Sequence, residues 1–176
     1  MRSYEIKFIK SSFFFHDFRL VNIENLSDKI ILYFDQGLYF ENTTEGQVDY
    51  MMTNPRLVLY KSNDDISKED LSGLIGELSQ VLNLDVNPDL GLKEVEKELD
   101  RSYDINIYKD GSYAKISLDK FLKLNFEIIN ESFGYGYIRF AGIVTGYKNP
   151  KKWQNASLEI YHNNEAELIY DSLEKL

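Results

Sequence analysis

The sequence predicts an α+β fold in which a curved antiparallel sheet of many short strands packs on one face against two central helices. Apolar residues alternate with polar ones over most of the chain, whereas the stretch 62–101 repeats its apolar residues at helical spacing. The aromatic content of 14%, with 13 Tyr and 11 Phe, also favours sheet, because these residues are strand formers that bury large areas. At 176 residues we expect a single domain with a strand block at 1–61, a helical segment at 62–101 and a strand block at 102–176.

The first strand block is built from short runs separated by turn residues. Tyr4, Ile6 and Phe8 alternate with charged residues, which indicates a first strand. Asp35-Gln36-Gly37 is typical of a hairpin turn, and Asn54-Pro55 separates two further runs that we expect to pair. The expected strands are 4–8, 19–24, 30–34, 38–40, 47–52 and 56–61.

Two helices are predicted in the middle of the chain. Between Leu71 and Leu82 the apolar residues recur at i, i+3, i+4 and i+7, which places them on one face of a helix. Asn87 and Pro88 are a typical helix start, and the apolar residues from Leu92 onwards give this second helix a narrow apolar edge. We expect both helices to lie on one face of the sheet.

The second strand block is more regular than the first. Lys109-Asp110-Gly111-Ser112 predicts a tight hairpin, and the run 122–128 is the clearest half-buried strand. Asn130-Glu131-Ser132 indicates a turn into a strand at 133–140. Asn163-Asn164 predicts a hairpin onto a last strand at 165–170, after which we expect the tail to form a short helical turn or to fray.

The negative charge is concentrated in the helical segment. Residues 62–101 hold eleven acidic and four basic residues, a net charge of −7 out of −9 for the chain. Such a field disfavours nucleic-acid binding, which needs a basic surface, and suits a partner protein with a basic surface. A second interpretation is that the acidity serves solubility alone.

Composition also bears on the cellular setting. The chain has no cysteine, so disulfides and thiolate metal sites are excluded. The first residues alternate and include Glu5, unlike a signal peptide, and no apolar run approaches the about 20 residues that span a bilayer. We therefore expect a cytoplasmic protein that needs no membrane and no cofactor.

His16 and Asp17 are the first residues to consider for catalysis. Adjacent His and Asp ligands occur in metal-dependent phosphohydrolases, but such sites need further His and Asp ligands. The chain has one other histidine, His162, so a metal site requires the two histidines to meet in space. The more ordinary interpretation is a turn anchored among Phe rings. Gly134-Tyr135-Gly136 lacks the third glycine of a dinucleotide-binding motif and indicates strand glycines.

The run Phe15-His16-Asp17-Phe18-Arg19-Leu20, followed by the run 29–34, resembles the opening of several small bacterial proteins, many of them immunity proteins of polymorphic toxin systems. Residues 153–160 also resemble their closing strands. The resemblance implies a non-enzymatic cytoplasmic inhibitor that masks a toxin domain, and it implies no particular site residues.

These observations favour a non-enzymatic binding protein, an immunity protein that masks a toxin through an acidic face. The candidate partner-binding residues are Glu69, Asp70, Glu77, Glu94 and Glu98. One alternative is a metal-dependent hydrolase or small-ligand enzyme that uses His16, Asp17 and His162. Another alternative is a phage or structural assembly subunit. Some of the many tyrosines are also candidates for a binding surface.

Overall fold

The computed structural model describes residues 2–5, 13–61, 102–109, 111–134, 136–146 and 153–176. The chain divides into two compact units, Met1–Ser62 together with Tyr103–Leu176, and Asn63–Ser102. All of the described strands belong to the first unit. The segment 62–101, for which two helices are predicted, lies outside the described residues.

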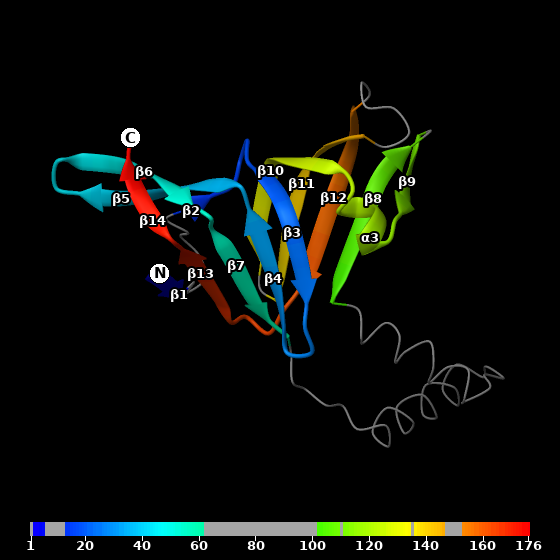
Figure 1. The fold of residues 1–176 in the computed structure, drawn as a ribbon, viewed down its shortest axis with the longest axis horizontal. Helices are drawn as coiled ribbons and strands as arrows, with labels where there is room; N and C mark the ends of the chain where they lie inside the picture. Colours follow the sequence, from blue (N-terminus) through cyan, green and yellow to red (C-terminus); the bar gives the residue numbers. More distant parts are fainter. Residues whose placement is uncertain (1, 6–12, 62–101, 110, 135, 147–152) are drawn as a thin grey trace, which may run out of the picture. The chain divides into compact units, whose positions relative to one another are not determined.

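The predicted α+β fold is wrong for the part of the chain that the structure describes, which is nearly all-β (Figure 1). Two antiparallel sheets make up this part, and its one helix is the short α3 (Leu118–Phe121). Within the same residues no helix is long and apolar enough to cross a membrane. The sequence predicts that the apolar face of the sheet packs on helices. In the structure, side chains on this face pack against one another across the curled sheet and against Phe13 of the second sheet.

The larger sheet has ten strands. In spatial order they are β1 (Arg2–Glu5), β13 (Ala166–Tyr170), β7 (Arg56–Tyr60), β4 (Lys29–Phe34), β3 (Arg19–Asn25), β10 (Asn125–Gly134), β11 (Tyr137–Thr145), β12 (Trp153–Tyr161), β8 (Tyr103–Lys109) and β9 (Ser112–Lys115). The smaller sheet has four strands, β14 (Ser172–Lys175), β6 (Gly46–Thr53), β5 (Gln36–Thr43) and β2 (Phe13–Phe14).

The ten-stranded sheet curls so that its inner face encloses the core. Phe34 on β4 and Phe140 on β11 have ring centroids 5.7 Å apart, although β3 and β10 lie between their strands in the sheet. In a flat sheet three strand spacings would separate them by about 14 Å. The pairing between β3 and β10 joins two halves of the sheet, and Figure 1 shows β3 and β4 in front of β10 and β11.

One long bent hairpin connects the two sheets. One arm is β4 followed by β5, and the other is β6 followed by β7. β4 pairs with β7 in the larger sheet, β5 pairs with β6 in the smaller sheet, and the turn lies between Thr43 and Gly46. The arms bend where Asp35 accepts hydrogen bonds from the backbone N–H groups of Arg19 and Gln36, both at 2.8 Å. The predicted turn at 35–37 and the predicted pairing around Asn54-Pro55 are therefore wrong, because both positions are corners at which a strand passes from one sheet to the other.

The two halves of the ten-stranded sheet are also joined at the lower end in Figure 1. Residues 162–165 link β12 in one half to β13 in the other, so the hairpin predicted at Asn163-Asn164 is wrong. Asn163 N–H donates to the Tyr60 carbonyl at 2.8 Å, and Tyr60 N–H donates to the Glu165 carbonyl at 3.1 Å. These bonds bring the end of β7 against the link.

Some of the other predicted elements are confirmed, but the predicted strand 133–140 is wrong, because β10 ends at Gly134 and β11 begins at Tyr137. The hairpin at 109–112 joins β8 to β9, and the predicted strand 19–24 corresponds to β3. The tail forms β14, which pairs with β6, so the predicted helical turn or fraying is wrong. Alternation correctly separates inner from outer positions on β4 and β13, where every second residue is buried.

Candidate functional site

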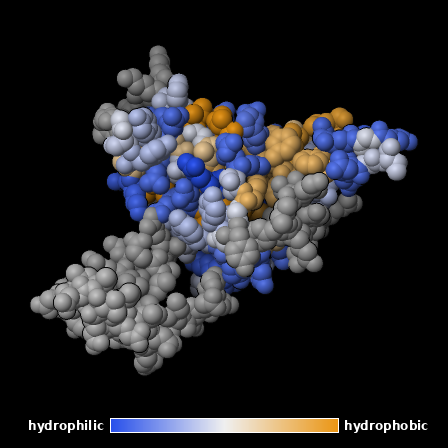
Figure 2. Space-filling model, turned by 180° about the vertical axis from the view of Figure 1, so that it is seen from behind, coloured by the Kyte–Doolittle hydropathy of each residue, from blue (hydrophilic) through white to orange (hydrophobic). Residues whose placement is uncertain are grey.

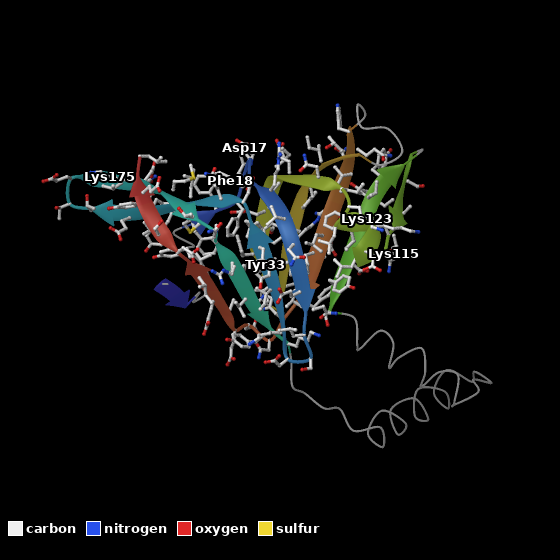
Figure 3. The ribbon with its side chains drawn as sticks, viewed as in Figure 1. Asp17, Phe18, Tyr33, Lys115, Lys123 and Lys175 are labelled. Atoms are coloured by element: carbon white, nitrogen blue, oxygen red, sulfur yellow. The ribbon has the colours of Figure 1, made fainter. Side chains whose placement is uncertain are left out.

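His16 and Asp17 form a tight turn between β2 and β3. His16 Nε2 lies 3.2 Å from Asp17 Oδ1, and both side chains are about half exposed or more. Asp17 has a φ of 67°, a left-handed conformation that Asp tolerates better than most residues, and its N–H donates to the Ile128 carbonyl. These contacts explain His16 and Asp17 as residues of a turn that is hydrogen-bonded to β10. Figure 3 labels Asp17 at the upper end of β3.

His162 lies at the other end of the sheet, directly after β12. Its side chain is buried, its Nδ1 accepts a hydrogen bond from Asn164 N–H at 3.1 Å, and burial lowers its pKa. The Asp17 N–H donates to Ile128 on β10, which is opposite Gly142 on β11. The His162 N–H donates to Gly136, which precedes Gly142 by six residues. Six residues span about 20 Å in a strand. The structure therefore does not bring the two histidines together. Within the described residues, no group of three or more His, Cys, Asp or Glu side chains is placed to hold a metal ion.

The five acidic residues predicted to bind a partner, Glu69, Asp70, Glu77, Glu94 and Glu98, lie outside the described residues. Their role stays a prediction. The candidate site that the structure does describe is therefore built from different residues.

A hollow of about 300 Å³ lies on the outer face of the sheet half formed by β9, β10, β11 and β12. Its lining residues are Tyr113, Ile129, Asn130, Arg139, Ala141, Gly142, Ile143, Asn155, Ala156 and Ser157. Figure 2 views the molecule from behind and shows hydrophobic side chains in several places on this side, between hydrophilic ones. The volume is at the lower end of the range for small-molecule pockets, and a single large side chain of a partner also fits such a space.

The hollow exists because its floor is made of small residues. On adjacent β11 and β12, Ala141 pairs with Ser157 on the outer face, whereas the neighbouring pair Gly142 and Ala156 faces the core. No side chain at these positions is large enough to fill the space above the sheet. Larger side chains on the surrounding strands form the walls, so the surface is concave at this place.

A β-bulge supplies one of these walls. The register of β10 with β11 passes from Ile128↔Gly142 to Asn130↔Ala141, which leaves Ile129 as an extra residue. Ile129 faces outwards and is 42% exposed. A Cβ atom on Gly142 would lie 2.0 Å from the Glu127 carbonyl oxygen, so only glycine allows the two strands to approach this closely at the bulge.

Aromatic side chains are exposed on β8, β9, β11 and β12, and one of them, Tyr113, lines the hollow. Trp153 is 64% exposed and Tyr113 is 58% exposed, and the rings of Tyr108 and Tyr113 meet edge to face with centroids 5.3 Å apart. Tyr137 and Tyr161 are also exposed and are opposite each other on β11 and β12. Rigid rings with polar tips provide contact area at a small entropic cost, which is why Tyr and Trp are enriched at protein interfaces.

The charges near the hollow are paired. Arg139 Nε lies 3.3 Å from Glu159 Oε1, and Lys115 Nζ lies 3.3 Å from Asp104 Oδ1. Figure 3 labels Lys115 beside β8 and β9. The described lining includes amides, a hydroxyl, a phenol and one guanidinium, but no histidine, carboxylate or lysine. Such a surface can provide hydrogen bonds and apolar contact.

Sequence reasoning did not locate this site, although part of its signal was present. In the sequence, Ala156, Leu158 and Ile160 alternate with Ser157, Glu159 and Tyr161, which predicts that the first three face the core and the other three face outwards. The structure buries Ala156, Leu158 and Ile160 in the core. What alternation does not show is that outward residues of four strands meet around a floor of small residues.

Comparison with known proteins adds no relatives: no protein-family model, no curated protein and no solved structure matches this chain. The resemblance to immunity proteins therefore remains a prediction.

Proposed function

We propose that this chain is a non-enzymatic binding protein, specifically an immunity protein that neutralises a toxin domain by masking a basic surface. The observation that supports this most is the set of exposed aromatic residues on β8, β9, β11 and β12, of which Tyr113 lines the hollow. The others are Tyr108, Tyr137, Trp153 and Tyr161. A rigid sheet that presents several exposed aromatic rings and paired charges has the composition of a protein-binding surface.

The proposal assigns two tasks to two parts of the chain. The acidic segment 62–101 attracts a basic partner over distances up to about a Debye length, about 8 Å at physiological ionic strength. The aromatic face then provides the short-range contacts that hold the complex together. Long-range attraction acts mainly on the association rate, whereas buried contacts act mainly on the dissociation rate.

The first test uses the catalytically inactivated product of a toxin gene adjacent to the gene of this protein. We expect a 1:1 complex whose association slows as salt is added. The double variant Glu94→Lys, Glu98→Lys is expected to slow association about 10-fold at low salt, because it removes negative potential that steers the partner. Surface plasmon resonance at two salt concentrations measures this effect.

Glu45→Lys is the control for charge, because Glu45 is an exposed acid at the turn of the β5–β6 hairpin. It is expected to change the association rate much less than the double variant. An absence of binding to the adjacent gene product contradicts the proposed function. Binding that is insensitive to salt and to both variants contradicts the role assigned to the acidic segment.

The second test concerns the aromatic face. Tyr113→Ala and Trp153→Ala are each expected to weaken the same complex by about 1–2 kcal/mol, chiefly through faster dissociation. Both side chains are more than half exposed, so the free energy of unfolding should change by less than about 0.5 kcal/mol.

Val21→Ala is the control for apolar truncation, because Val21 is 55% exposed on β3 in the other half of the sheet. It should leave the affinity unchanged. Unchanged affinity in both aromatic variants means that the partner uses a different face.

A further inference from the structure

Glu131 is a carboxyl group on the core side of β10. The extra residue Ile129 shifts the alternation of the strand by one position. Residues after the bulge therefore face the side opposite to the one they would face in a regular strand. Glu131 is therefore opposite Phe140, which is fully buried, and Phe133 is opposite the buried Ile138. Without the bulge, the same side chain would face the solvent.

Aromatic rings surround this part of the core. Phe13 lies 5.6 Å from Phe133 between ring centroids, and Phe140 lies 6.3 Å from both Phe15 and Phe133. The backbone N–H of Phe15 donates a hydrogen bond of 2.8 Å to Glu131 Oε2. This bond joins β10 to the end of the segment Phe13–Phe15, which contains β2. Phe15 and Glu131 are 116 positions apart in the sequence.

Charged groups on the neighbouring elements are engaged elsewhere. In the segment after β2, His16 and Asp17 pair with each other and are exposed. On β11, Arg139 pairs with Glu159 on the outer face, and on β10 itself Glu127 precedes the bulge and is opposite Ile143. No charged side chain of the described residues affects the pKa of Glu131, so its negative charge would have only the Phe15 N–H to stabilise it.

We propose that Glu131 is a pH-sensitive latch for the segment Phe13–Phe15: the neutral acid holds this segment on the core, and loss of its proton favours release of the segment. The reason is that a carboxylate in an aromatic environment gains hydration when the segment opens, whereas a neutral acid gains little. Because β2 pairs with β5, release would uncover the edge of the four-stranded sheet and the rings of Phe13 and Phe15. This proposal does not depend on the proposed function.

The titration of Glu131 agrees with this geometry. Burial raises its pKa from 4.5 to about 7, and the hydrogen bond from Phe15 offsets part of that rise. Because the pKa is higher in the folded protein, the stabilisation from the neutral acid is fully present below pH 4.5. It declines between pH 4.5 and about 7 and is absent above that range. The latch is thus expected to loosen as the pH rises towards and through neutrality.

Amide hydrogen exchange of the full chain tests the latch. At pH 8.5 the protection factor of the Phe15 amide is expected to be on the order of 10- to 100-fold lower than at pH 5.5. This exchange should depend little on low concentrations of urea, because only a short segment opens. The Leu158 amide in the middle of β12 should instead exchange through global unfolding and depend steeply on urea.

Glu131→Gln keeps an oxygen that accepts the Phe15 hydrogen bond but cannot ionise, so its Phe15 protection should not change with pH. Glu127→Gln, on the same strand before the bulge, should keep the wild-type pH dependence. Equal protection at both pH values in the wild type, or the same pH dependence in Glu131→Gln, overturns the proposal. The ¹³C shift of the Glu131 carboxyl in the wild type gives a second measurement, and a pKa near 4.5 would likewise overturn it.

Discussion

Replacing Phe34 with Ala is expected to lower the free energy of unfolding by about 3–5 kcal/mol. The Phe34 ring stacks on Phe15 with centroids 3.9 Å apart and an angle of 11°, and it also contacts Phe140 across the core. These contacts join β4 in one half of the sheet to β11 in the other. Truncation would leave a cavity where the curled sheet closes on itself, and chemical denaturation with urea measures the loss.

Phe40→Ala is the matched control for this substitution. Phe40 is only partly buried, and its ring lies 6.3 Å from that of Phe14 on the four-stranded sheet. We expect a loss of about 1 kcal/mol there, because little of the core depends on the ring. Similar losses in both variants would mean that the aromatic contact between the sheet halves does not stabilise the closed sheet.

Gly142→Ala is expected to cost about 3 kcal/mol or more. The added Cβ would lie 2.0 Å from the Glu127 carbonyl oxygen, a backbone atom that moves only if β10 shifts away from β11. Such a shift would disturb the bulge that places Ile129 at the hollow and Glu131 in the core. Thermal unfolding followed by circular dichroism measures the change in stability.

Gly134→Ala is the control, because the atoms nearest to its added Cβ belong to the side-chain ring of Tyr137, which is 36% exposed, and not to backbone. Its cost should stay below about 1 kcal/mol. If Gly142→Ala unfolds at the same temperature as the wild type, the close approach of the strands at the bulge is incorrect.

Alternation in the sequence predicted most strands and, outside the bulge in β10, the side that most of their residues face, because local sterics and burial of one face determine both. It could not predict which strands pair. The runs before Asp35 and after Gly37 look like a hairpin, yet they form one arm that bends from one sheet into the other. The distinction depends on hydrogen bonds from residues distant in sequence, such as Phe34 N–H to the Pro55 carbonyl.

Polar residues within an apolar strand were the other source of error. Asn130-Glu131-Ser132 has the composition of a turn, but β10 continues through it to Gly134. The partner strand explains why: Gly142 accommodates the bulge, and the aromatic segment Phe13–Phe15 covers the inward carboxyl. Neither feature is adjacent to Glu131 in sequence.

The candidate site shows the same division. The sequence by itself determined the excess of acidic residues in 62–101, the absence of cysteine and the outward position of residues such as Tyr161. Only the tertiary structure decided that Tyr113, Ile129 and Asn155 meet around one hollow and that His16 and His162 lie apart. The physical reason is that composition and alternation are properties of neighbouring residues, whereas strand order, curl and the bulge depend on contacts between segments far apart in the chain.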